Sequence, residues 1–237
     1  MIAGLQKMTL LDFPGKVACT LFLQGCNFRC PFCHNSDLLP HQGEEFITVD
    51  AFLKFLEGRK GLLDGVAITG GEPTGQPDLP DLIRKIKDLG FAVKLDTNGT
   101  NPKMLKQLVA DGLLDYVAVD VKNSPKKYAE TVGLPSLNLD KITESLAFLI
   151  ASDTEYEFRT TLVAQFHTAE DMEEIGQWLQ SLVPGRKPKK LFLQSFVDRD
   201  SVVFSGLSAP TAEQIADFAR ILTPYVGEVS VRGVETQ

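Results

Sequence analysis

The chain has 237 residues, with 24 Lys and Arg against 31 Asp and Glu, so its formal net charge is −7. This acidic balance argues against a nucleic-acid partner, because proteins that bind a phosphate backbone gain affinity from clustered basic side chains. A chain of this size can bury on the order of 70% of its unfolded surface, and 43% of its residues are hydrophobic. We therefore expect one folded domain over residues 1–237.

The elements expected from the pattern alternate between strands and helices. Short β-branched or aromatic runs predict strands at residues 17–24, 65–69, 92–96, 116–121, 156–163, 190–194 and 228–231. Amphipathic segments behind polar caps or prolines predict helices at residues 49–56, 79–89, 104–110, 139–150, 170–182 and 211–222. Such alternation is typical of a parallel sheet covered by helices.

The number of units favours one parallel architecture over the others. A complete eight-unit barrel takes about 250 residues, and this chain has six strong βα units and a terminal strand. An open doubly wound sheet is the other arrangement that such a pattern allows. We expect an α/β fold in which residues 17–237 form a partial (β/α)6 barrel, with residues 1–16 as a short N-terminal extension and a C-terminal strand.

Neither a secretory signal nor a membrane span is expected. Residues 1–16 lack a basic segment followed by an apolar core. No charge-free apolar run approaches the roughly 18 residues that cross a bilayer. These features predict a cytoplasmic protein without a membrane partner.

Three of the four cysteines lie within eight residues, directly after the first predicted strand, with the spacing C-x3-C-x2-C. Thiolates in so short a loop can face one centre, and such thiolates hold iron-sulfur clusters. These are Cys26, Cys30 and Cys33, whereas Cys19 lies inside the strand and is expected to be a small buried hydrophobe. Three ligands leave one iron of a 4Fe-4S cluster open, as reactive metal sites require. The alternative is a structural zinc site with His34 as its fourth ligand.

The cysteine spacing, with Phe32 before the third cysteine, resembles the signature of the radical S-adenosylmethionine (SAM) superfamily. The resemblance implies that the open iron binds the amino and carboxylate groups of SAM and that Phe32 contacts the adenine. Residues 12–16, Asp-Phe-Pro-Gly-Lys, and residues 24–35 are similar to activases of glycyl radical enzymes. They are most like the activating proteins of anaerobic ribonucleotide reductase, because pyruvate formate-lyase activases, their close relatives, usually read Asp-Gly-Pro-Gly.

A second motif, Gly70-Gly71-Glu72, follows the second predicted strand. By itself, a glycine pair there indicates a turn where the backbone bends or is closely approached. The resemblance implies more, because in this superfamily the motif holds the methionine ammonium of SAM. Glu72 is the expected charge partner of that ammonium.

The next two strands end in Asp96-Thr97-Asn98 and in Asp120-Val121-Lys122. Without context these are a turn and a solvated strand end. Similar segments in pyruvate formate-lyase activase imply that they bind SAM, with Lys122 near its carboxylate. By the same resemblance Asp96, Thr97 and Asp120 hold a monovalent cation.

Other candidates rest on position in the chain. Arg159 is a cation inside a strand-like run, for which SAM, substrate or a surface acid could be the partner. By the resemblance, Gln194 lies near the SAM ribose, although relatives have a histidine near this point, and His34 adjoins the cofactor. Three side chains carry no motif and are expected to be structural: His41, His167 and Trp178.

The resemblance implies a reaction as well as a site. A flavodoxin or ferredoxin reduces the single cluster, SAM is cleaved to methionine and a 5'-deoxyadenosyl radical, and the radical takes hydrogen from a glycine of a partner enzyme. The three cysteines and Lys122 are the expected catalytic residues. Anaerobic ribonucleotide reductase is the expected partner, with pyruvate formate-lyase or another glycyl radical enzyme as an alternative. A radical SAM enzyme that acts on a small metabolite and a non-catalytic iron-sulfur or zinc protein are the competing classes.

Overall fold

The computed structural model describes residues 2–39 and 47–233, so His41 lies outside the described residues. The chain forms two compact units, each built from segments that are far apart in the sequence. The first, which we call unit 1, contains Met1–Asn27, Asp37–Thr97 and Asn101–Ala118. Unit 2 contains Phe28–Ser36, Asn98–Thr100 and Val119–Gln237. The expectation of one domain stays a prediction.

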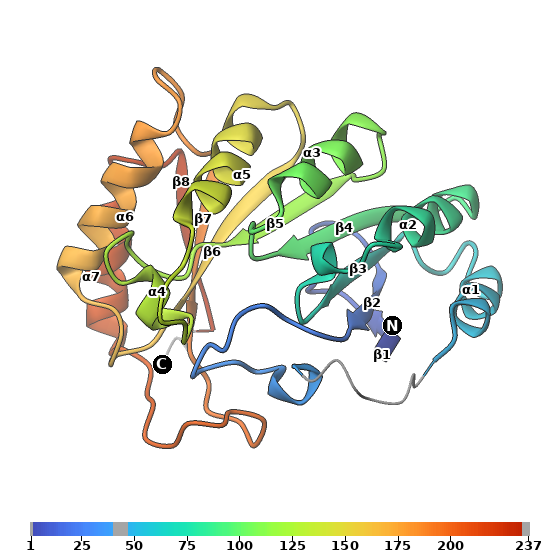
Figure 1. Ribbon diagram of the computed structural model, residues 1–237, viewed down its shortest axis with the longest axis horizontal. Coiled ribbons are helices and arrows are strands. Elements are labelled where there is room, and N and C mark those ends of the chain that lie inside the picture. Colours follow the sequence, from blue (N-terminus) through green and yellow to red (C-terminus); the bar gives the residue numbers. More distant parts are fainter. Residues whose placement is uncertain (1, 40–46, 234–237) are drawn as a thin grey trace. The chain divides into compact units, whose positions relative to one another are not determined.

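Unit 1 is a sheet with covering helices (Figure 1). Its strands are β1 (Ile2–Thr9), β2 (Ala18–Leu23), β3 (Gly65–Gly70), β4 (Ala92–Thr97) and the first part of β5 (Tyr116–Asp120). Strand β1 runs antiparallel to β2, whereas β2, β3 and β4 are parallel. The helices are α1 (Val49–Glu57), α2 (Leu79–Asp88) and α3 (Pro102–Ala110), and the 3-10 turns η1 (Ser36–Leu38) and η2 (Pro73–Gly75) follow β2 and β3. The carboxyl ends of the three parallel strands therefore share one edge of this sheet.

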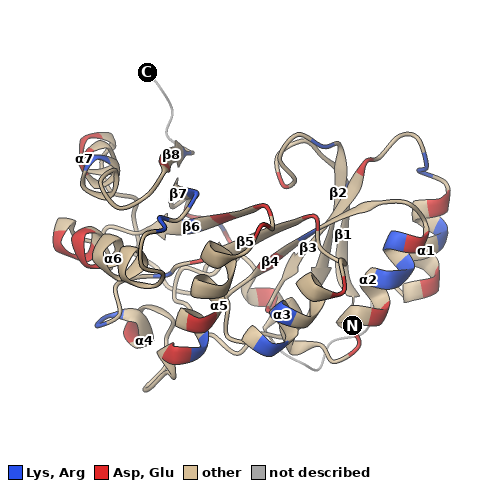
Figure 2. Cartoon of the chain, turned by 90° about the horizontal axis from the view of Figure 1, so that it is seen from above, with Lys and Arg blue, Asp and Glu red and all other residues tan. Residues whose placement is uncertain are grey.

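The local sequence explains where these helices begin and which face they bury. The side chains of Thr48 and Asn101 accept hydrogen bonds from backbone N–H groups in the first turns of α1 and α3, as capping residues do. Helix α2 buries Leu79, Ile83 and Ile86. The positions of its basic and acidic residues are coloured blue and red on the ribbon in Figure 2. The apolar face of α2 is thus the face that packs in unit 1.

Unit 2 contains the end of β5 and three further strands, β6 (Tyr156–Leu162), β7 (Lys190–Ser195) and β8 (Glu228–Arg232). Strands β6, β7 and β8 are parallel, with Phe158 opposite Leu191 and Leu191 opposite Val229. The helices are α4 (Tyr128–Thr131), α5 (Leu139–Ala151), α6 (Ala169–Ser181) and α7 (Ala212–Leu222), of which α6 and α7 pack against each other (Figure 1). In both units the strand order follows the chain, and β5 is shared.

Each strand and each helix predicted from the sequence is present, within two residues of its predicted ends. Besides the two 3-10 turns, one strand and one α-helix were not predicted. Residues 1–16, expected to be an extension, contain β1, whose middle residues are exposed or half-buried and so lack a clear alternation. The four-residue helix α4 is too short to leave a periodic pattern.

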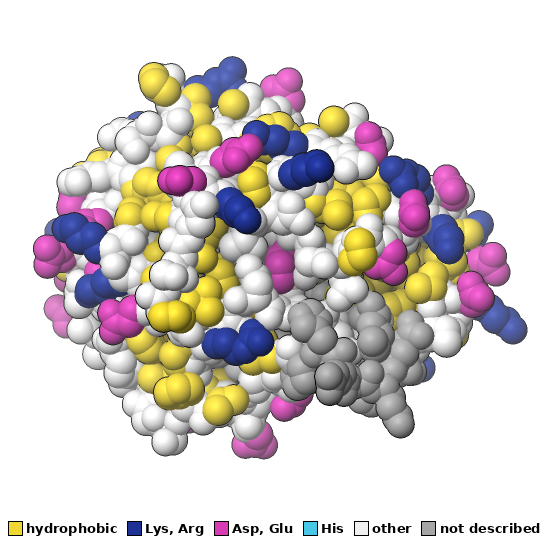
Figure 3. All heavy atoms as spheres, in the orientation of Figure 1, with side chains coloured by type: hydrophobic (Ala, Val, Ile, Leu, Met, Phe, Trp, Pro, Cys, Tyr) yellow, Lys and Arg dark blue, Asp and Glu magenta, His cyan; other side chains and the backbone are white. Residues whose placement is uncertain are grey.

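Two further properties of the described residues concern the length of apolar helices and the distribution of surface charge. Within residues 2–39 and 47–233, no helix is long and apolar enough to cross a membrane. On the face drawn in Figure 3, Lys and Arg side chains alternate with Asp and Glu side chains and do not gather into one basic patch.

Candidate active site

The turn Gly70-Gly71-Glu72 is packed against the end of β2. Gly71 N–H donates to Leu23 O at 2.8 Å, and Glu72 N–H donates to Gly25 O at 2.8 Å. A Cβ atom on Gly71 would lie 1.9 Å from Gly25 O, and one on Gly70, whose φ is +118°, would lie 2.3 Å from Leu23 O. The glycine pair is therefore required by the close approach of the backbone that leads into Cys26.

The Glu72 carboxylate is held in a fixed orientation inside unit 1. Its side chain is 4% exposed. Its Oε1 accepts hydrogen bonds from Thr74 N at 3.0 Å, from Thr74 Oγ1 at 2.5 Å and from Thr97 Oγ1 at 2.6 Å. The hydroxyl of Thr97, expected to bind a cation, thus donates to Glu72. Such a set of donors orients the carboxylate of the residue expected to bind an ammonium group.

Asp96 has a buried cation beside it on the same strand. Lys94, which is almost completely buried, forms an ion pair with Asp96. Both residues are on β4 and, being two apart, project from the same face of it. A metal cation at Asp96 would therefore meet an ammonium group there.

Gln24 is the first residue of the run 24–35 that resembles the activases, and no role of its own was expected for it. It is 5% exposed, and its Oε1 is the one buried side-chain oxygen or nitrogen in the described part of the chain without a hydrogen-bond partner. A buried acceptor without a donor costs about 1–3 kcal/mol. Gln24 lies two residues before Cys26, so a bound group that brings a donor fits this end of β2.

The segment with the second and third cysteines belongs to unit 2, where a hydrophobic cluster shapes it. Cys33 N–H donates to Cys30 O at 3.1 Å, which closes a turn. Phe32 is 4% exposed and packs with Val163 and Phe196, and Cys30 lies against the same cluster. In this structure Phe32 is thus a packing residue of the cysteine loop, and its contact with adenine stays a prediction.

His34 ties the same loop to the segment after β7. Its Nε2 lies 2.7 Å from Val197 O, and its ring stacks on Phe196 at a centroid distance of 5.5 Å. A carbonyl oxygen only accepts hydrogen bonds, so Nε2 carries the proton. Ser36 also donates to Ser201 O of that segment. His34 therefore anchors the cysteine loop.

Asp120, Lys122 and Arg159 form one charge network in unit 2. Lys122 Nζ lies 3.0 Å from Asp120 Oδ2, and Arg159 Nε lies 3.0 Å from Asp120 Oδ1. Burial alone would raise the pKa of Asp120, but the charges of Arg159 and Lys122 lower it to about 2. Burial alone would lower the pKa of Lys122, but the negative charges of Asp120 and Cys30 raise it. Asp120 is thus an acidic partner of Arg159, and the pair is mostly buried.

The last two candidates, Gln194 and Asn98, lie at the ends of β7 and β4. Gln194 is half-buried near the end of β7, opposite Thr161 on β6. Asn98 is buried, and its Oδ1 accepts from Thr100 N at 3.0 Å and from Thr100 Oγ1 at 2.7 Å. Asn98 therefore closes the turn after β4.

Most predicted site residues lie at carboxyl ends of parallel strands, where barrel enzymes build active sites. In unit 1 these are Gly70, Glu72 and Asp96, and in unit 2 they include Lys122 and Gln194. Among residues 2–39 and 47–233, no group of three His, Cys, Asp or Glu side chains is already arranged to hold a metal ion.

Comparisons with known proteins agree with this arrangement. Residues 20–179 match the family model of the radical SAM superfamily. The chain is 30% identical to a protein of Methanocaldococcus jannaschii named as a candidate glycyl-radical enzyme activating enzyme, over 99% of this chain and 96% of that protein. It is 32% identical to the pyruvate formate-lyase-activating enzyme of Clostridium pasteurianum, over 52% of either chain.

Solved structures show the same fold. SuiB of Streptococcus suis bound to its precursor peptide SuiA matches with a TM-score of 0.70 at 13% identity, over 90% of this chain and 48% of SuiB. QueE of Escherichia coli matches with a TM-score of 0.52 at 20% identity, over 98% of this chain and 92% of QueE. The predicted fold class is confirmed.

Proposed function

The chain belongs to the radical SAM superfamily, and from this premise we propose that it generates a glycyl radical on a partner enzyme, an anaerobic ribonucleotide reductase. Its cofactors are one 4Fe-4S cluster and SAM, as in the superfamily. The observation that carries the activase role is the match to a glycyl-radical enzyme activating enzyme over 99% of this chain. We place the reaction in the cytoplasm, with a flavodoxin or ferredoxin as electron donor.

When bound, the cluster and SAM supply a reductive cleavage in which one electron, SAM and a glycine C–H bond give methionine, 5'-deoxyadenosine and a glycyl radical. In our proposal Cys26, Cys30 and Cys33 hold the cluster. Glu72 binds the ammonium of SAM, and Lys122 binds its carboxylate. The buried, oriented Glu72 and the charged Lys122 support these roles, because the amino acid part of SAM carries one positive and one negative charge.

Further contacts with the cofactor are part of the same proposal. Gly70 and Gly71 let the backbone of the Glu72 turn approach closely. The remaining residues assigned to SAM are those that line the cysteine loop or end the strands: Phe32, His34, Thr97, Asn98, Arg159 and Gln194.

A monovalent cation held by Asp96, Thr97 and Asp120 is the third element of the proposal. In this structure Lys94 accompanies Asp96, and Lys122 and Arg159 accompany Asp120. Asp96→Asn combined with Asp120→Asn should abolish the dependence of the rate on sodium or potassium. A wild-type rate that is independent of both ions would refute cation binding.

The choice of ribonucleotide reductase as partner rests on residues 12–16, Asp-Phe-Pro-Gly-Lys. In this structure Phe13 is buried and its ring lies 6.3 Å from that of Tyr116, and Asp12 Oδ2 accepts from Thr20 Oγ1 at 2.5 Å. The run is therefore packed into unit 1. Residues 12–16 support the choice of partner because they resemble the same run in related activases. This support does not require residues 12–16 to contact the partner.

Anaerobic reconstitution tests the activase proposal in two steps. The protein is loaded with iron and sulfide, reduced, mixed with SAM and assayed for 5'-deoxyadenosine, with Cys30→Ala and the matched Cys19→Ala variant in parallel. We expect product from the wild type and from Cys19→Ala, because Cys19 is buried away from solvent. Cleavage retained in Cys30→Ala would refute the cluster assignment.

The second step identifies the partner. The wild-type protein is incubated with SAM, reductant and either anaerobic ribonucleotide reductase or pyruvate formate-lyase from the same organism, and the glycyl radical is measured by electron paramagnetic resonance. We expect the radical signal on the reductase. A signal only on pyruvate formate-lyase would overturn the choice of partner and retain the activase role.

A further inference from the structure

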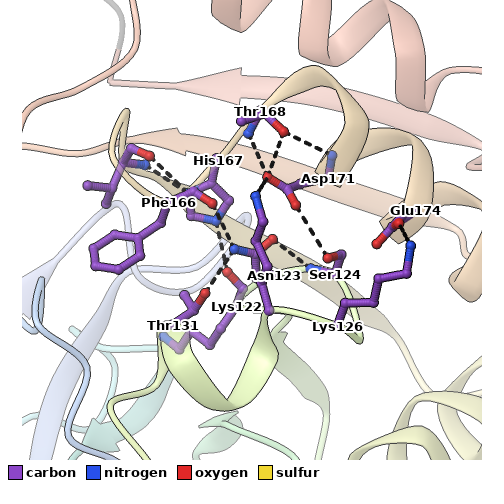
Figure 4. Close-up of polar contacts among 12 residues, drawn as sticks. Lys122, Asn123, Ser124, Lys126, Thr131, Phe166, His167, Thr168, Asp171 and Glu174 are labelled. Atoms are coloured by element: carbon purple, nitrogen blue, oxygen red, sulfur yellow. Dashed lines mark hydrogen bonds and ion pairs between the residues drawn. The ribbon is translucent and has the colours of Figure 1, made fainter.

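The backbone of Lys122 is hydrogen-bonded on both sides by buried side chains, and Figure 4 shows the His167 side. Lys122 N–H donates to Tyr128 Oη at 3.2 Å, and the same hydroxyl donates to Asp120 O at 3.1 Å. On the other side, His167 Nε2 lies 2.9 Å from Lys122 O. Tyr128 and His167 together form what we call the Lys122 clamp.

The protonation of both side chains suits this arrangement. Lys122 O can only accept, so His167 Nε2 carries a proton and donates. Burial lowers the pKa of His167, so the ring is neutral near pH 7 and its Nδ1 accepts from Val163 N–H at 3.1 Å. Burial raises the pKa of Tyr128, which keeps its hydroxyl as a donor to Asp120 O. Each bond of the clamp therefore has one donor and one acceptor.

The residues that follow Lys122 are also fixed (Figure 4). The completely buried Asn123 donates from Nδ2 to Thr131 Oγ1 at 2.8 Å and to Phe166 O at 2.9 Å. Its Oδ1 accepts from Ser124 N–H at 2.7 Å. The loop after β5 is thus attached both to α4 and to the segment that contains His167.

Helix α4 links this loop to the cysteine loop within unit 2. Its first residue, Tyr128, holds Lys122, and just beyond its end Val132 O accepts from Arg29 N–H at 2.9 Å. A Cβ atom on Gly133, whose φ is +69°, would lie 2.2 Å from Arg29 O. Arg29 is the residue before Cys30, so α4 sets the distance between the Lys122 backbone and this cysteine.

We propose that Tyr128 and His167 are positioning residues for SAM binding, which hold Lys122 in register with the Cys30 segment so that its ammonium is placed for the SAM carboxylate. This inference rests on the role of Lys122 in the proposed function. Neither clamp residue needs to touch SAM. Both act through the backbone of Lys122, so their effect on SAM affinity should require the Lys122 side chain.

The first test compares SAM affinity in reconstituted holoenzyme variants. Tyr128→Phe and His167→Phe should each weaken SAM binding about 10-fold. This is the effect expected when the displaced Lys122 ammonium loses about one charged hydrogen bond to the SAM carboxylate. His167→Gln keeps a side-chain N–H for Lys122 O and should recover part of the loss. The matched control is Tyr156→Phe, because Tyr156 is equally buried and its hydroxyl accepts from Lys189 N–H at 3.0 Å.

The readout is the dissociation constant of SAM, measured by equilibrium dialysis on the reconstituted protein without reductant so that SAM is not cleaved, with iron content alongside. Positioning predicts weaker SAM binding with iron content equal to that of the Tyr156→Phe control. Unchanged SAM affinity in Tyr128→Phe, which loses only a hydroxyl, would overturn the inference even where His167→Phe fails to fold. An equal loss in the Tyr156→Phe control would also overturn it.

A double-mutant cycle with Lys122→Met separates this inference from the proposed function. We expect that Lys122→Met weakens SAM binding and that adding Tyr128→Phe changes it no further. Additive losses would overturn positioning through Lys122 and leave the role of Lys122 intact. Unchanged affinity in Lys122→Met alone would overturn both roles, while SAM cleavage by the wild type would still support the activase.

Discussion

The replacement of Glu72 by Gln removes one negative charge while conserving the shape of a buried side chain. Glu72 Oε1 accepts from Thr74 N, Thr74 Oγ1 and Thr97 Oγ1. An amide oxygen in the same place can accept from the same three donors, so unit 1 should keep its fold. What Gln cannot supply is the charge that attracts an ammonium group.

The expected effect follows from the energy of a charged hydrogen bond. Such a bond contributes about 1.5–3 kcal/mol, and each 1.4 kcal/mol is roughly a factor of 10 in affinity. We therefore expect the dissociation constant of SAM to rise about 10- to 100-fold in Glu72→Gln. The free energy of unfolding should change by less than about 1 kcal/mol, because Thr74 and Thr97 keep an acceptor for their hydrogen bonds.

SAM binding is measured on the reconstituted protein without reductant, so that SAM is not cleaved, with iron content and chemical unfolding recorded for each variant. The matched control is Glu157→Gln, because Glu157 is also a buried carboxylate but pairs with Arg232 at 3.1 Å on β8. This control should lose stability and keep its SAM affinity. Wild-type SAM affinity in Glu72→Gln, with the iron content unchanged, would refute the ammonium contact.

Three further predictions test how the site is supported. Gly71→Ala should cost about 1–3 kcal/mol of stability and reduce iron content, because its Cβ would overlap Gly25 O, whereas Gly75→Ala, with no atom within 4 Å of its Cβ, should do neither. Burial raises the pKa of Cys19 to about 12, so this thiol should resist alkylation at pH 8 in the folded, cluster-free protein. Mass spectrometry should find only the other cysteines modified. Asp171→Asn should lower the free energy of unfolding by about 1–2 kcal/mol at pH 7. Burial would raise the pKa of Asp171, but hydrogen bonds from Lys127 and Thr168 outweigh burial and lower it. The difference between variant and wild type should therefore shrink below about pH 4.

Each of these predictions has an outcome that contradicts it. Iron content in Gly71→Ala equal to that in Gly75→Ala would mean that the turn does not shape the cysteine loop. Alkylation of Cys19 at the rate of the loop cysteines would contradict its burial. A stability loss in Asp171→Asn that is constant from pH 7 to pH 3 would show that the carboxylate charge is not what stabilises the start of α6.

The strands and long helices were predictable because each carries its own signal. Strand β3, for example, is a run of small and β-branched residues whose first four are buried. Helix α6 is preceded by Thr168, whose side chain and that of Asp171 form a capping box. The two missed elements lack such signals. Strand β1 gains its order from pairing with β2, and α4 from the contacts of Tyr128 with the loop after β5.

The site divides in a similar way. Glu72, Asp120 and Lys122 were predicted because each belongs to a short motif whose residues are adjacent in the sequence. The contacts that fix them were not predicted, because His167 contacts the Lys122 backbone across 45 positions of the chain and Arg159 reaches Asp120 across 39. His167 was expected to be structural, and nothing around it in the sequence indicates which backbone carbonyl its ring would meet.

The charge network around Asp120 should couple binding of the proposed cation to binding of SAM. Its two carboxylate oxygens already face Lys122 and Arg159, at 3.0 Å each. A sodium or potassium ion added to this arrangement would be a third positive charge beside one negative charge, which is unfavourable in a partly buried site. In our proposal, binding of SAM changes the balance, because its carboxylate would offer Lys122 a second anionic partner and release one oxygen of Asp120. Cation binding and SAM binding should therefore favour each other, and by linkage each should strengthen the other by the same factor.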